Sequence, residues 1–122
     1  MSSIDAQRPL YEIKANLFKG LAHPFRIRIL ELLSASPEVS VADLQQQTGL
    51  EASHLSQHLS VLRRYRLVTS ERRASHVYYR LANTQVAEML AVARALLLEL
   101  SKTEGAYLAA SDALAMPAGV AS

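Results

Sequence analysis

Gly49 separates two short amphipathic segments, and this arrangement constrains the fold more than any other feature of the sequence. Before it, Ser40 is suited to cap a helix over Val41–Thr48, with Asp43 in the first turn where the helix dipole favours an acid. Gly49 is suited to end that helix because glycine adopts left-handed backbone angles without strain. A longer helix, capped by Ser53, is predicted to run to about Arg66. We therefore expect two helices joined by a tight turn.

The longer helix is apolar on one side and polar on the other. Leu55, Leu59 and Leu62 recur at the spacing of a core-facing stripe. On the outward side, glutamine can pair with adenine, serine and protonated histidine can donate hydrogen bonds, and arginine can neutralise phosphates. The predicted DNA-contacting residues of this helix are Ser53, His54, Ser56, Gln57, Ser60, Arg63 and Arg64. The alternative is a polar face that contacts only solvent.

Two short runs of β-branched, aromatic and apolar residues follow, Leu67–Thr69 and Val77–Leu81, separated by the polar residues 70–76. They predict a β-hairpin, or wing. Arg72 and Arg73 fall near its tip, where long cationic side chains can reach a minor groove or the DNA backbone. The alternative is that these charges only keep the hairpin soluble.

Three more helices complete the predicted fold. Apolar residues at helical spacing predict one helix from about Pro9 to Ala22, a second beginning at Pro24, and a last one from Thr84 to Lys102. Residues 34–40 have the composition of a loop. The predicted fold is therefore mainly α (α+β), a winged helix-turn-helix with the order ααααββα. It occupies residues 9–104, after a flexible N-terminus over 1–8 and before a disordered, alanine-rich tail over 105–122.

Positive charge is concentrated in one segment. From Ala52 to Arg80 there are six arginines and a single acid, so this segment carries about +5, whereas the first 51 residues sum to about −1 and the last 42 to about −2. A localised basic surface is typical of proteins that bind polyanions. A solvated charged face is the alternative.

Other features exclude several classes of protein. The 122 residues suit one domain, and the absence of cysteine excludes disulfides, thiolate metal sites and cysteine redox switches. No apolar run approaches the roughly 20 residues of a membrane span, and no leader segment is visible, so we expect a cytoplasmic protein that does not contact a membrane. The sequence contains no His-Glu-x-x-His, glycine-rich phosphate loop or Gly-x-Ser-x-Gly motif, so we expect no enzyme.

Two separated motifs carry a family resemblance. Leu21–Leu30 (LAHPFRIRIL) and Ser56–Arg64 (SQHLSVLRR), the second followed by Leu67-Val68, resemble the ArsR/SmtB family of bacterial winged-helix repressors. The resemblance extends from about Tyr11 to Leu100. It implies a dimer built from the first and last helices, an operator with inverted-repeat symmetry, and release of DNA when an inducer binds.

The apolar surface of the first and last helices also favours a homodimer, because a thin single layer would not cover it. The alternative is that both helices pack only within one chain. The predicted interface residues are Leu10, Leu17, Met89, Ala93, Leu96, Leu97 and Leu100.

Metal-sensing members of the family carry ligands at positions where this chain has other residues. Ser40 and Ala42 stand where thiolate-type sensors have cysteines, and Asn83 and Gln85 stand where other members have aspartate and histidine on the last helix. The second ligand pair of that helix falls near Leu96 and Glu99. The familiar metal sites are therefore not expected here.

Histidines offer one other candidate metal site. His54 and His58 are four residues apart on one side of a helix, so they form a candidate pair for a divalent ion such as nickel or zinc at a non-standard site. For His58 we favour packing or a phosphate contact, and for His23 capping or packing. The inducer stays open between an ion, a small organic ligand, a partner protein and none.

These observations predict a sequence-specific repressor that binds double-stranded DNA with an inverted repeat as a homodimer. The alternative is a winged-helix module that binds another protein, such as a co-regulator. A histidine-based hydrolase is disfavoured because the chain lacks the motifs that such enzymes use.

Overall fold

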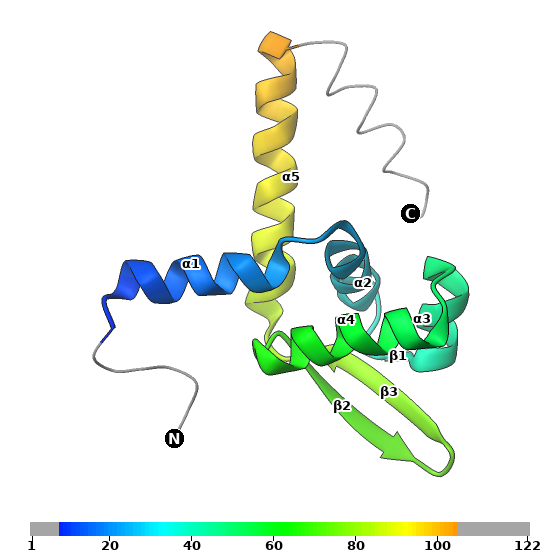
Figure 1. Cartoon of the computed structure of the whole chain (residues 1–122). Helices are drawn as coiled ribbons and strands as arrows, with labels where there is room; N and C mark the ends of the chain where they lie inside the picture. The colour runs from blue at the N-terminus through cyan, green and yellow to red at the C-terminus, as the bar shows by residue number, and fades with distance from the viewer. Residues whose placement is uncertain (1–7, 105–122) are drawn as a thin grey trace. The chain divides into compact units, whose positions relative to one another are not determined.

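The computed structural model describes residues 8–104. Its elements are α1 (Leu10–Leu21), α2 (Pro24–Ser34), β1 (Val39–Ser40), α3 (Val41–Thr48), α4 (Ala52–Arg64), β2 (Val68–Arg73), β3 (His76–Leu81) and α5 (Thr84–Glu104) (Figure 1). The chain divides into two compact units, Met1–Ala87 and Glu88–Ser122, with the boundary inside α5. The flexible N-terminus and disordered tail predicted from the sequence lie outside the described residues, apart from Arg8.

Local capping explains where α2 and α3 begin. His23 precedes Pro24 in an extended conformation, and its Nδ1 accepts a hydrogen bond from the Phe25 amide at 3.1 Å, which confirms its capping role. Ser40 caps α3 as predicted, because its hydroxyl accepts from the Asp43 amide at 3.0 Å. Gly49 ends α3 in the left-handed region, with φ 73°.

The predicted bounds of α4 were wrong at both ends. Glu51, not Ser53, is the N-cap, and its carbonyl accepts the Leu55 amide at 3.0 Å without any side-chain cap. The helix ends at Arg64 because Arg66 has a φ of 64°, which cannot continue a right-handed helix. The turn after Gly49 is therefore shorter than predicted, and α4 begins earlier.

The wing is the antiparallel hairpin of β2 and β3, paired from Val68↔Leu81 to Arg73↔His76. Its strands are longer than predicted and leave only Ala74 and Ser75 in the turn, with Ala74 at φ 55°. Residues 70–73 appeared loop-like in the sequence because this part of β2 is exposed and therefore polar.

One strand was missed. Residues 34–40 were predicted to be a loop, but Val39 and Ser40 form β1, which pairs with Tyr79 and Tyr78 of β3. In the sheet, the strands lie in the order β1-β3-β2. Along the chain, the added strand changes the order of elements from the predicted ααααββα to ααβααββα. A strand of two residues is too short to show an alternating pattern.

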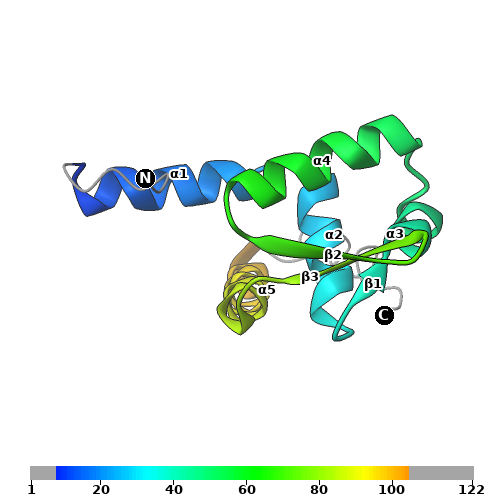
Figure 2. The ribbon, with the colours of Figure 1, turned by 90° about the horizontal axis from the view of Figure 1, so that it is seen from below.

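The core lies between α2, α3, α4 and the sheet. Figure 2 shows α4 alongside the hairpin, and the apolar sides of these elements meet there. The buried hydrophobic residues are Leu21, Ile29, Leu30, Leu33, Val39, Leu44, Leu55, Leu59, Leu62, Leu67, Val68, Tyr79 and Val86.

The last helix, α5, starts where the Asn83 side chain accepts a hydrogen bond from the Gln85 amide at 2.9 Å. Beyond Glu88, this helix exposes several large apolar side chains: Val92, Leu96, Leu97, Leu98 and Leu100. Within residues 8–104, no helix combines the length and apolar character needed to span a membrane.

Candidate nucleic-acid interface

The outward face of α4 is the first part of the candidate interface. Leu55, Leu59 and Leu62 are 1%, 2% and 0% exposed and fix the helix to the core. This burial turns the opposite side of the helix to solvent. All seven residues predicted to contact DNA on this helix are exposed: Ser53, His54, Ser56, Gln57, Ser60, Arg63 and Arg64.

The C-terminal end of α4 is held by α1. Gly20 lies so close to Tyr65 that a Cβ on the glycine would be 2.6 Å from Cγ of the ring. Arg26 of α2 strengthens this corner because its Nε donates a hydrogen bond to the Gly20 carbonyl at 2.8 Å. The candidate reading helix is therefore positioned at its end as well as along its buried side.

On the wing, two arginines are paired with acids. Arg73 donates through Nη1 to Glu38 Oε1 at 3.2 Å and through Nη2 to Oε2, and its guanidinium lies 4.0 Å from the centre of the Tyr78 ring. The hydrogen bond from Arg73 lowers the pKa of Glu38, and the same bond raises the pKa of Arg73. Arg80 donates to Glu71 at 2.7 Å. These two cations are already largely compensated.

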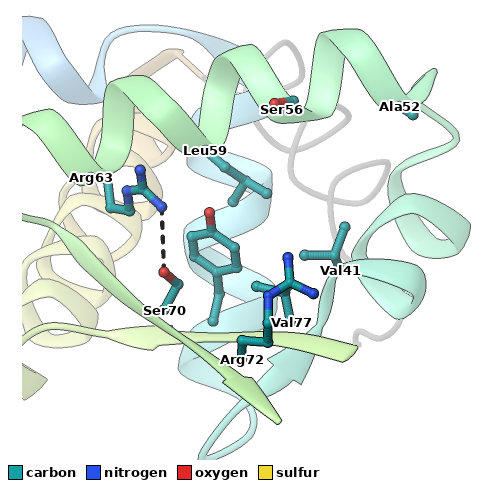
Figure 3. A pocket seen from close by; sticks show the side chains of 9 residues that line it. Val41, Ala52, Ser56, Leu59, Arg63, Ser70, Arg72 and Val77 are labelled. Atoms are coloured by element: carbon teal, nitrogen blue, oxygen red, sulfur yellow. Dashed lines mark hydrogen bonds between the residues drawn. The ribbon is translucent and has the colours of Figure 1, made fainter. Parts of the chain in front are cut away.

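Four other arginines of the basic segment have no carboxylate partner within residues 8–104: Arg63, Arg64, Arg66 and Arg72. Arg63 donates to the Ser70 hydroxyl at 3.4 Å and so connects α4 to β2. Figure 3 shows Arg63 and Arg72 on either side of an open pocket of about 390 Å³ between the helix and the wing. Within the basic segment, the positive charge without an acid partner thus lies on α4, on Arg66 just after it and on Arg72 of the wing.

The arginines predicted to contact DNA therefore differ in whether they are free to bind a phosphate. Arg63, Arg64 and Arg72 are exposed and without acid partners in the described chain, whereas Arg73, which is also exposed, is held by Glu38. The role of Glu38 was missed, because it lies 35 residues before Arg73 in the sequence. A prediction of β1 would have indicated this pair, because β1 begins at Val39, directly after Glu38.

One member of the candidate metal pair, His58, lies in a cluster of rings with His23 and Phe25. His54 is exposed, while His58 is half-buried with its ring centroid 4.4 Å from that of His23 and 6.1 Å from that of Phe25. Burial lowers the pKa of His58, and electrostatic interaction with His23, Arg26 and His54 lowers it further. Among the described side chains, no three histidines or acids come together as a metal site.

The predicted dimer residues are mostly uncovered in the single chain. Leu10, Leu96, Leu97 and Leu100 are 64%, 57%, 52% and 45% exposed, and Ala93 is exposed. Leu17 and Met89 are half-buried. Tyr11 and Val92, which were not predicted, are even more exposed, at 73% and 67%.

Comparisons with known proteins identify the family. A model described as "Helix-turn-helix domain" matches residues 21–71, which contain α2, α3 and α4. The chain is 51% identical over 90 residues to the uncharacterized HTH-type transcriptional regulator Rv0081 of Mycobacterium tuberculosis, covering 73% of this chain and 78% of that protein. It is 36% identical over 90 residues to the biofilm growth-associated repressor of Xylella fastidiosa, with 74% and 77% covered.

Solved structures agree with the sequence relatives. The crystal structure of Rv0081 from M. tuberculosis matches with a TM-score of 0.74 and 46% identity, covering 82% of this chain and all of that one. A solution structure from Mycobacterium bovis matches with a TM-score of 0.68 and 29% identity, covering 81% and 92%. It is described as a homodimeric winged helix-turn-helix DNA-binding domain of a possible ArsR-family regulator.

The predicted fold class and the predicted absence of enzymatic function agree with these relatives, which are named as transcriptional regulators. The chain therefore belongs to the ArsR family of winged helix-turn-helix transcriptional regulators.

Proposed function

We propose that the chain represses transcription by binding an inverted-repeat operator as a homodimer, with α4 of each copy in a major groove and each wing beside it. The observation that carries the proposal is the exposed polar face of α4 next to arginines that have no acid partner in the described chain. A duplex offers a phosphate backbone to those cations and base edges to the serines and glutamine.

The homodimer is supported by the apolar side chains that α1 and α5 expose, and by the homodimeric M. bovis relative. Two copies related by a two-fold axis would place their reading helices about one DNA turn apart. Repression is the action named for the X. fastidiosa relative.

Binding of DNA is favoured over binding of a protein at this face. Four arginines without acid partners in residues 8–104 suit a polyanion, and the face of α4 lacks the exposed apolar side chains that anchor protein interfaces. A protein co-regulator would bind elsewhere, and an inducing nickel or zinc ion at His54 and His58 remains a prediction.

The experiment is a fluorescence anisotropy titration with DNA from the promoter of the protein's own operon and with random DNA of equal length. We expect preference for the promoter by a factor of about 10³ or more at physiological salt. Gln57→Ala should reduce that preference, Arg64→Gln should weaken binding to both DNAs, and the α2 control Glu31→Gln should change neither. Equal affinity for the two DNAs would contradict the proposal.

A further inference from the structure

The pocket between α4 and the wing has a composition that phosphate contacts alone do not explain. Its volume, about 390 Å³, lies in the range of small-molecule sites, which is about 300–1,000 Å³. Its lining comes from α3, α4, β2 and β3, all within the unit Met1–Ala87. It is therefore a property of one folded unit.

Two cations are available at this pocket. Arg63 comes from α4 and Arg72 from β2, and neither has a carboxylate partner within residues 8–104 (Figure 3). The residues on either side of Arg72 in β2 do not share this availability. Arg73 pairs with Glu38 and Glu71, and Glu71 also accepts from Arg80, while Arg72 lines the pocket. Two guanidinium groups favour a carboxylate, which can accept charge-assisted hydrogen bonds from both.

The wall between the two cations is apolar. Leu59 is 2% exposed, and Val41 and Val77 are half-buried, yet all three line the pocket. A backbone phosphate would contact the arginines but would leave these side chains against water. A ligand with a compact apolar body would cover them and gain from their burial.

Tyr79 also lines the pocket, and the residue as a whole is 7% exposed. A phenol hydroxyl can donate a hydrogen bond to a carboxylate. Tyr79 therefore adds a third polar side chain to the two arginines of the pocket lining.

We propose that this pocket binds a small organic carboxylate with a compact apolar body, held by Arg63 and Arg72, and that the bound ligand competes with DNA for these two arginines. The second part rests on the proposed function, since the same cations are predicted to contact the phosphate backbone. Occupancy of the pocket would then release the protein from its operator.

The first test is made without DNA. The full chain, labelled with ¹⁵N, is titrated with benzoate, with 3-methylbutanoate and with inorganic phosphate. At least one carboxylate should give saturable shifts at the amides of Ser56, Ser70 and Val77, and phosphate should bind more weakly. Arg72→Gln should weaken carboxylate binding about tenfold, as expected for one lost charge-assisted hydrogen bond. Arg66→Gln, which removes an arginine outside the pocket, should leave it unchanged.

Three results would overturn the ligand site. The first is the absence of a saturable amide shift with either carboxylate. The second is binding of phosphate as tight as that of the carboxylates. The third is an affinity for the carboxylate that is the same in Arg72→Gln as in Arg66→Gln. Thermal unfolding of both variants checks that they fold. Tyr79→Phe is a second probe that keeps the packing of the ring, and it should also weaken binding.

The second test adds DNA. The carboxylate that binds should lower the affinity of the wild-type protein for promoter DNA, and should have less effect on the Arg72→Gln variant. If it binds without changing DNA affinity, competition is refuted while the ligand site stands. If the protein does not prefer its promoter at all, the proposed function fails, and the first titration still decides the site.

Discussion

Arg73 on the wing binds both carboxylate oxygens of Glu38, which lies 35 residues earlier in the sequence. A bidentate pair of this kind fixes the planar guanidinium, and the Tyr78 ring 4.0 Å away holds it further. Arg73 is therefore oriented toward its own chain, while the adjacent Arg72 has no acid partner in the described residues. Of these two neighbouring arginines, Arg73 therefore forms an ion pair within the chain, whereas the charge of Arg72 is available to a ligand.

Removing the Glu38 carboxylate should strengthen DNA binding. In Glu38→Gln, Arg73 loses its ionic partner and becomes available to a phosphate, so the affinity should rise. The slope of log affinity against log salt should steepen by about 0.9, which corresponds to one more phosphate contact. Anisotropy titrations at several salt concentrations measure both quantities. Unchanged or weaker binding in Glu38→Gln, relative to the control Glu31→Gln, would argue against this role.

Gly20→Ala should destabilise the protein. The added Cβ would lie 2.6 Å from Cγ of the Tyr65 ring, so the ring or the helix has to move. Overpacking of this kind typically costs about 1–3 kcal/mol, partly offset by the better helix propensity of alanine. Chemical denaturation measures the free energy of unfolding. The penalty should shrink in a Tyr65→Leu background, and an equal penalty there would show that the contact is not its cause.

Stability should fall as the pH drops below the ordinary pKa of histidine, near 6.5. Burial lowers the pKa of His58 in the folded state, and electrostatic interaction with His23, Arg26 and His54 adds to this. The unfolded chain therefore binds the proton more readily, so the free energy of unfolding decreases as the pH falls through 6.5 toward the folded pKa. Denaturation at about pH 7.5 and about pH 5.5 should show a smaller loss for His58→Gln than for the wild type. The same loss in both proteins would assign the effect to other groups.

A charge within the exposed apolar face of α5 should prevent dimer formation. Leu97 is 52% exposed and lies on the side of the helix that also carries Ala93 and Leu100. Leu97→Glu would place a carboxylate where a partner copy is expected to bury apolar surface, so the protein should sediment as a monomer and bind its operator weakly. Ala91→Glu, on the opposite side of the same helix, is the control. A dimer that persists in Leu97→Glu would refute the predicted interface.

The parts of the fold that were predicted correctly depend on local signals. The Ser40 cap and Gly49 fix the bounds of α3, and Pro24 fixes the start of α2, because each acts within a few residues. β1 depends on pairing with β3, almost 40 residues later, and its two residues show no pattern of their own. The start of α4 was misplaced because a serine was preferred as its cap, although Glu51 takes that position without a side-chain bond.

The candidate site was predictable to a similar degree. The spacing of Leu55, Leu59 and Leu62 was enough to identify which side of α4 is exposed. The sequence could not show which arginines are compensated, because Glu38 reaches Arg73 only through the folded sheet. The pocket was equally hidden, since its lining combines residues from four elements.

The most direct test of the account is site-specific cross-linking from α4 to DNA. The chain has no cysteine, so Gln57→Cys provides a single attachment point for a photo-activated cross-linker. With operator DNA, the label at position 57 should react with bases at two symmetric positions about one helical turn apart, whereas a label at Glu31→Cys on α2 should not. A complex that forms on the operator without base cross-links from position 57 would contradict the assignment of α4 as the reading helix.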